Sequence, residues 1–224
     1  MPLATQLPDN AGRMTTEAAS RFGEVVEAAV ETLTGQCHRL YETPHIGTLV
    51  RAGEAVYGVV SGIATTALDP TRRVIARGAD AATEAEVYAA HPQLERLLRT
   101  DVTITVVGHR PEGDGKAFAQ YLPPLPPRIH TFLYACTVGE VRDFVGLGED
   151  GASGGLARLD FVTLLVGGRP NADDVLAAAL RQMALAFDAP GTFLVEASRA
   201  VAVLLASDTA RLNAILRRLP LDRG

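Results

Sequence analysis

Short alternating runs of apolar and polar residues dominate the first part of the chain and predict β-strands. In residues 102–107, Val-Thr-Ile-Thr-Val-Val, threonine alternates with aliphatic side chains, which is typical of a strand with one buried face. Two β-branched runs, residues 46–50 and 55–60, are separated by turn residues. A last strand is predicted over residues 129–135. These patterns predict an antiparallel β-rich unit.

A helical pattern interrupts these strands. Thr83 is followed three residues later by Glu86, a spacing typical of the capping box at the start of a helix. Leu94, Leu97 and Leu98 then share one face of a helix predicted over 83–99, with a kink or break at Pro92. Residues 22–33 fit both a helical stripe and a strand, and periodicity alone does not decide between them.

The last third of the chain has helical periodicity. Asn171 is predicted to cap a helix whose first turn carries Asp173 and Asp174. An apolar stripe follows at spacings of four, three and four residues: Leu176, Leu180, Met183 and Phe187. Further helices are predicted over 159–166, 193–206 and 209–219. Together they predict a small helical bundle.

Composition divides the chain between these two regions. Five of the ten residues 146–155 are glycine, which is typical of a linker. Residues 1–150 carry a net charge of −6, whereas residues 151–224 carry +1. The predicted organisation is therefore a tail over 1–15, a barrel unit over 16–145 with the inserted helix 83–99, a linker over 146–157 and a helical region over 158–224. The fold class is α+β, with a small closed or nearly closed antiparallel β-barrel followed by a C-terminal helical bundle.

The sequence contains no complete phosphate-binding, zinc-binding or nucleophile motif. Residues 110–117 approach a phosphate-binding loop, but Arg110 replaces its first glycine and Ala117 its hydroxyl residue. The cysteines, Cys37 and Cys136, do not form a zinc-ligand spacing with the histidines. No Gly-x-Ser-x-Gly nucleophile motif is present. The sequence therefore predicts no catalytic residue, cofactor or metal site, and a protein that is not an enzyme.

The cellular location follows from similar observations. The chain begins with no signal-peptide pattern and has no apolar run of about 18 residues, the length that a membrane span requires. Two cysteines in 224 residues suit a reducing compartment. A cytoplasmic protein without a membrane partner is expected.

Two stretches are candidates for contacts with a partner. The first carries Arg72, Arg73 and Arg77, which suit phosphate or carboxylate groups, or else form a solvated strand edge. The second is a stiff segment with four prolines followed by an arginine: Pro123, Pro124, Pro126, Pro127 and Arg128. It forms either a ridge that faces a partner or a strap over the mouth of the barrel.

The order of several motifs resembles a known family. Residues 22–27 read Phe-Gly-Glu-Val-Val-Glu, residues 36–50 read Gln-Cys-His-Arg-Leu-Tyr-Glu-Thr-Pro-His-Ile-Gly-Thr-Leu-Val, and residues 56–60 read Val-Tyr-Gly-Val-Val. This order resembles the HerA–ATP synthase barrel, or HAS-barrel, which occurs in HerA-type DNA-translocating ATPases and in rotary ATP synthase subunits. The motifs at 69–73, 92–100 and 121–127 resemble a stand-alone bacterial branch of that family.

The resemblance resolves the ambiguous segment and implies a function. It makes residues 22–30 and 33–41 strands. The ATPase module of those motors is missing from this sequence, so ATP hydrolysis is not implied. The resemblance implies an assembly or adaptor module that forms a homo-oligomer, such as a ring, beside a DNA-processing or ring ATPase. The C-terminal helices would then be able to pack on a neighbouring copy rather than on their own barrel.

Two other hypotheses remain open at this stage. One is a single-stranded nucleic-acid-binding barrel that uses Arg72, Arg73, Arg77 and Arg128. The chain has no Trp and only 5% aromatic residues, which does not favour stacking platforms for bases. The other is a small-ligand pocket inside the barrel.

Overall fold

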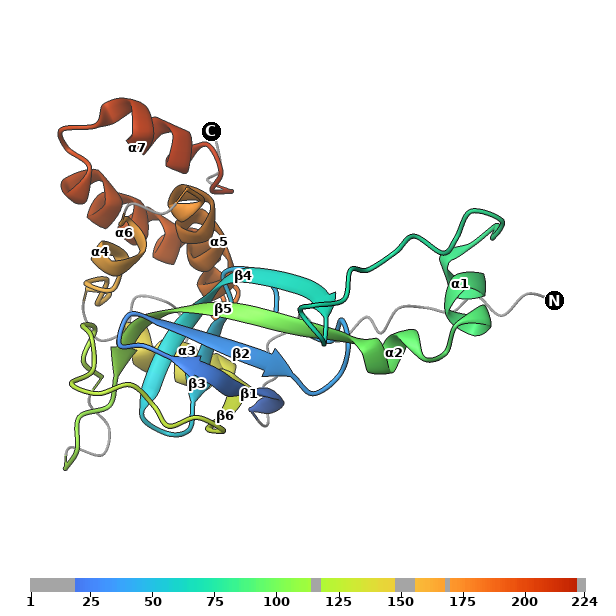
Figure 1. Cartoon of the computed structure of the whole chain (residues 1–224). Helices are drawn as coiled ribbons and strands as arrows, with labels where there is room; N and C mark the ends of the chain where they lie inside the picture. Colours follow the sequence, from blue (N-terminus) through green and yellow to red (C-terminus); the bar gives the residue numbers. More distant parts are fainter. Residues whose placement is uncertain (1–18, 114–117, 148–155, 168–169, 221–224) are drawn as a thin grey trace.

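The computed structural model describes residues 19–113, 118–147, 156–167 and 170–220. Within them, six antiparallel strands form a closed barrel in the order β1-β2-β5-β4-β3-β6 (Figure 1). The strands are β1 (Ser20–Ala28), β2 (Thr32–Cys37), β3 (Leu49–Ala52), β4 (Val56–Ala67), β5 (Leu98–His109) and β6 (Phe132–Ala135). The predicted α+β fold with a barrel and a helical part is confirmed. The predicted tail, residues 1–15, lies outside the described residues, as does most of the predicted linker.

The helices form two groups, and most of the C-terminal group lies at the end of the barrel opposite the first (Figure 1). The first is α1 (Glu84–Ala90) and α2 (Leu94–Leu97), between β4 and β5. The second follows β6 and consists of α3 (Val138–Val145), α4 (Val162–Leu165), α5 (Ala172–Ala184), α6 (Pro190–Leu204) and α7 (Thr209–Leu216). The observed bounds of α4, α6 and α7 lie close to the predicted ranges 159–166, 193–206 and 209–219.

The inside and the outside of the barrel carry separate apolar clusters. All six strands contribute to the interior, which holds Val25, Leu33, Val50, Val60, Ile104 and Leu133 among others. These side chains are at most 1% exposed. Such a packed interior argues against a small-ligand site inside the barrel.

The outer cluster joins the barrel to the C-terminal helices. Tyr57 and Val59 of β4 pack in one cluster with Phe144 of α3 and Leu176 of α5. The Asn171 side chain, at the start of α5, donates a hydrogen bond to the Ser61 carbonyl of β4 at 3.1 Å. The hypothesis that these helices pack on a neighbouring copy is therefore wrong, because they cover their own barrel. The division into two domains stays a prediction.

Several element boundaries differ from those predicted. The helix predicted over 83–99 is two short helices, and it ends early because Leu98 begins β5 and pairs with Ala67. The last strand begins at Phe132 rather than at residue 129, after His130, whose φ is 68°. α3 was not predicted, although Thr137 and Glu140 form its capping box.

The proline segment passes along the barrel. Leu122 packs against the interior cluster, and Pro123 is buried. Pro124, Pro126 and Arg128 are exposed. The buried contact of Leu122 supports the interpretation of this segment as a strap over the barrel.

Candidate functional site

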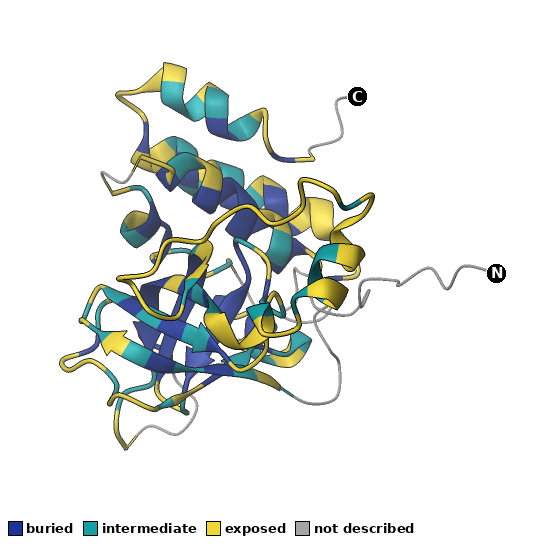
Figure 2. Ribbon diagram, turned by 45° about the vertical axis from the view of Figure 1, so that its right-hand side comes forward, coloured by how far each residue is buried: buried dark blue, intermediate teal, exposed yellow. Residues whose placement is uncertain are grey.

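The longest strands extend beyond the barrel as a two-stranded ribbon. Pairing of β4 with β5 continues from Gly62 and Thr103 to Ala67 and Leu98. β2 still pairs with β5 as far as Asp101, so residues 65–67 and 98–100 form the two-stranded part. β3 stops pairing with β4 at Val59. We call residues 62–100, which comprise this ribbon, the connecting loops, α1 and α2, the arm. It projects from the barrel on the side away from the C-terminal helices (Figure 1), and most of its surface is exposed (Figure 2).

A groove of about 610 Å³ lies on the arm. Its apolar lining comes from the ribbon, from α2 and from the loop between β4 and α1: Ala67, Leu68, Val74, Ile75, Leu94, Leu97 and Leu98. Val74 and Ile75 are 62% and 68% exposed, and Leu68 is 48% exposed. A cluster of large apolar side chains that remains this exposed is typical of a surface that binds another molecule.

Arginines surround this apolar lining. Arg72, Arg73 and Arg77 all lie along the groove, together with one acid, Asp69. Asp69 pairs with Arg72, with 3.4 Å between Oδ2 and Nε. Among the described residues, Arg73 and Arg77 have no ion pair. The groove therefore presents two arginines that are free to bind an anion.

Local interactions set the course of the loop. Asp69 Oδ1 accepts hydrogen bonds from the hydroxyl and the backbone N–H of Thr71, at 2.6 and 2.9 Å. These bonds hold the pKa of the Asp69 carboxyl below its usual range, so it stays ionised beside Arg72. The Leu68 N–H donates to the Leu97 carbonyl at 2.8 Å and closes the ribbon at the base of the loop. The turn therefore fixes where the arginine stretch begins.

A contact from the barrel braces the other end of the arm. The hydroxyl groups of Tyr41, in the segment after β2, and Tyr88, in α1, are hydrogen bonded at 2.6 Å. This bond raises the pKa of Tyr88 to about 12. Thr83 caps α1 by accepting from the Glu86 N–H, as its spacing predicts. Both tyrosines are thus engaged with each other, and neither lines the groove.

The predicted contact residues fall into two separate places. Arg72, Arg73 and Arg77 gather at the groove, whereas Arg128 and the four prolines lie on the strap and do not line it. The apolar half of the groove was missed, because Leu94, Leu97 and Leu98 also suit the buried face of one helix. The pair Val74-Ile75 inside the arginine stretch is a signal that could have shown it.

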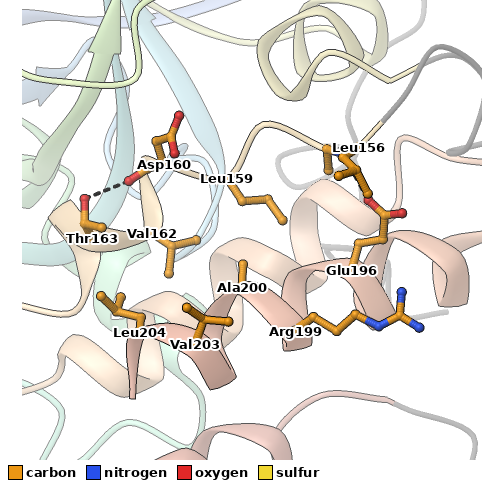
Figure 3. A pocket seen from close by; sticks show the side chains of 11 residues that line it. Leu156, Leu159, Asp160, Val162, Thr163, Glu196, Arg199, Ala200, Val203 and Leu204 are labelled. Carbon is orange, nitrogen blue, oxygen red and sulfur yellow. Dashed lines mark hydrogen bonds between the residues drawn. The ribbon is translucent and has the colours of Figure 1, made fainter. Parts of the chain in front are cut away.

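A second groove, of about 410 Å³, lies between α4 and α6 (Figure 3). Leu159, Val162 and Val203 form part of its apolar surface. Two of its polar side chains have partners within the chain: Glu196 accepts from the Ala157 N–H at 3.0 Å, and the Thr163 hydroxyl donates to the Asp160 carbonyl at 2.7 Å. Its other charged groups are the Arg199 guanidinium and the Asp160 carboxylate.

The cysteines show no sign of catalytic chemistry. Both are buried, and burial raises the pKa of the Cys37 thiol to about 11. Across the described ranges, no three His, Cys, Asp or Glu side chains gather where they could hold a metal ion. The helices that the structure describes include none with the length and apolar character needed to span a membrane.

Comparison with families and with curated proteins gave no match. No family model and no curated protein matches this sequence. The site therefore has to be interpreted from its own geometry.

Proposed function

We propose that this chain is a non-enzymatic assembly or adaptor module that binds a partner protein through the groove of its arm. The observation that carries the proposal is the combination of exposed Val74 and Ile75 with two arginines, Arg73 and Arg77, that lack an ion pair in the described structure. Apolar area supplies most of the binding free energy in such interfaces, and arginine pairs with carboxylates in a directed geometry. The groove suits a segment that carries both apolar and acidic side chains.

The resemblance to HAS-barrel proteins supports the wider part of this proposal. In that family the barrel belongs to ring-forming motors, which suggests a DNA-processing or ring ATPase as the partner and a cytoplasmic setting. It also suggests self-association of this chain. The closed barrel and the packed interior are compatible with an assembly role, since the arm is left as the projecting element.

Binding of single-stranded nucleic acid is the alternative that the same arginines raise. Proteins of that kind stack bases on aromatic side chains, and the residues that line the groove include none. Arg128 does not join the other three arginines. The chain carries a net charge of −5, which also disfavours a polyanion. A protein partner is therefore the better-supported choice.

The test compares two charge-reversal variants of the full chain. Arg73→Glu/Arg77→Glu alters the groove, and Arg39→Glu/Arg217→Glu alters two exposed arginines elsewhere. Affinity purification from the native host with quantitative mass spectrometry should give a protein whose recovery falls at least about tenfold with the groove variant only. Binding of that protein is then repeated with purified components.

Two results would contradict the proposal. One is a partner that binds the groove variant as well as it binds the unaltered chain. The other is binding of labelled single-stranded DNA or RNA that weakens steeply with salt and is lost in the groove variant, which would favour the nucleic-acid alternative.

A further inference from the structure

In the part of the chain that the structure describes, the outer edge of β4 beyond Ser61 has no neighbouring strand. On the side of β4 opposite β5, Val60 bonds to Gly47 and Thr48, and the Ser61 carbonyl accepts from Asn171. From Gly62 to Ala67 no described strand pairs with that side. Residues 63–66 are all exposed. The barrel is closed, but β4 leaves it and becomes an open edge (Figure 1).

The register shows which backbone groups face outward on this edge. Leu68 donates its N–H to the carbonyl of Leu97, so these two residues form a hydrogen-bonded pair. Such pairs alternate along an antiparallel ribbon, and residues 62, 64 and 66 therefore face β5. The N–H and carbonyl groups of Ile63, Thr65 and Ala67 point away from β5 to the open side. The edge thus presents three donors and three acceptors.

The usual protection of an open edge is missing from this segment. Residues 62–67 read Gly-Ile-Ala-Thr-Thr-Ala and contain no charged residue and no proline. Natural proteins place lysine, proline or a covering element on an exposed edge to prevent strand addition. Three of the six residues are β-branched, which favours the extended conformation. The segment is suited to accept another strand.

We propose that the edge of β4 pairs with the same edge of a second copy of this chain. The three outward residues are symmetric about Thr65, so an antiparallel two-fold arrangement places Thr65 opposite its own copy and Ile63 opposite Ala67. All three donors and acceptors of each copy then meet a partner, which gives six backbone hydrogen bonds. The absence of charge means that two identical edges do not repel each other.

This inference rests on the proposed self-association and names its surface. It does not depend on the arginine groove, whose apolar lining begins at Ala67, where the edge ends. A second copy is the occupant because the edge is complementary to itself and carries no charge that would select a different chain.

Three variants of the full chain test the surface. Thr65→Pro removes one outward N–H from each copy and leaves the backbone hydrogen bonds to β5 in place. Thr65→Lys puts two positive charges directly opposite each other across the two-fold axis. Both substitutions at Thr65 also remove the 2.9 Å hydrogen bond between the Thr65 and Thr100 hydroxyl groups. Thr66→Lys is the matched control, because residue 66 faces Ala64 of the other copy. Its neighbour on β5 is Arg99, whose charge is paired with Asp101 at 2.9 Å. Circular dichroism establishes that each variant is folded.

Light scattering behind size-exclusion chromatography, over a series of concentrations, gives the mass. The unaltered chain and Thr66→Lys should form a dimer of twice 23.7 kDa. Thr65→Pro and Thr65→Lys should each raise the dimer dissociation constant by at least about tenfold.

Three other outcomes would overturn the inference, and each identifies which part of it is wrong. A monomeric unaltered chain would overturn both the self-association and its surface, while the groove variants would still test binding of the partner protein. A dimer that persists in both Thr65 variants would overturn the surface alone. Equal loss in Thr65→Lys and Thr66→Lys would also overturn it, because a backbone edge distinguishes these positions.

Discussion

Gln120 shows how single polar side chains join the layers of this molecule. It is 7% exposed, and its amide nitrogen donates to the carbonyls of Phe144 and Arg158 at 2.8 and 2.9 Å. Its oxygen accepts from the Phe161 N–H at 3.3 Å. A buried amide with both ends satisfied fixes the position of its neighbours, because losing any one bond leaves a desolvated polar group. The strap, α3 and the segment before α4 are tied together at this residue.

Asn171 shows which part of a helix cap can be predicted from the sequence and which part cannot. Its place as the residue before α5 was predicted correctly from Asp173 and Asp174. Its side chain, however, makes no bond to the helix and instead donates to Ser61 of the barrel. Local spacing indicates where a helix begins, but the partner of a capping side chain depends on what packs beside it.

Gly47 offers a prediction about the contact between barrel and helices. Its φ is +90°, and a Cβ there would lie 2.4 Å from the Ala178 backbone of α5. We expect Gly47→Ala to lower the free energy of unfolding by about 2–4 kcal/mol, because strain and a backbone clash combine. Gly113 is the matched control, since its φ is +92° and a Cβ there would meet nothing within 4 Å.

Chemical denaturation measures the free energy of unfolding of both glycine variants. Gly113→Ala should show only the cost of the backbone conformation, about 1–2 kcal/mol. Equal destabilisation by the two changes would mean that α5 does not press on Gly47, contrary to the packing described above.

Elements were predictable where their pattern is local. The alternation at 102–107 and the apolar stripe of α5 were predicted correctly. The beginning of β5 was not, because Leu94, Leu97 and Leu98 suit a helical face equally well, and only pairing with Ala67 makes Leu98 a strand residue. For the same reason the groove could not be predicted, since its lining comes from segments whose contact is set by the ribbon.

The outer part of the arm, residues 69–96, should be removable as an element. α1 and α2 contain no buried residue, and Leu68 and Leu97 form a hydrogen-bonded pair at its base. Replacing residues 69–96 by Asn-Gly should therefore give a two-residue hairpin of a favoured type and lower the free energy of unfolding by less than about 2 kcal/mol. Binding of the partner protein should be lost. Circular dichroism and thermal unfolding measure the first effect, and loss of the β signal would show that the barrel needs the arm.

At the scale of the whole molecule, the apolar core does not follow the change in sequence composition. The chain changes charge and becomes rich in glycine near residue 150, which favours two separate domains. The outer cluster nevertheless runs from Tyr57 of β4 through Phe144 and Phe161 to Leu176, and all four are completely buried. The barrel and the C-terminal helices share this core, so neither can unfold without exposing apolar side chains of the other. Their stabilities are therefore coupled.

Leu176→Ala tests this coupling. The side chain is fully buried, and its truncation should lower the free energy of unfolding by about 2–5 kcal/mol. Since the chain has no tryptophan, Phe132→Trp and Leu185→Trp at exposed positions can report separately on the barrel and on the helices. One cooperative unit requires that both reporters give the same denaturant midpoint, and that Leu176→Ala lowers both midpoints together. A shift of the Leu185→Trp signal alone would instead show that the helices unfold independently and that the barrel is a domain in its own right.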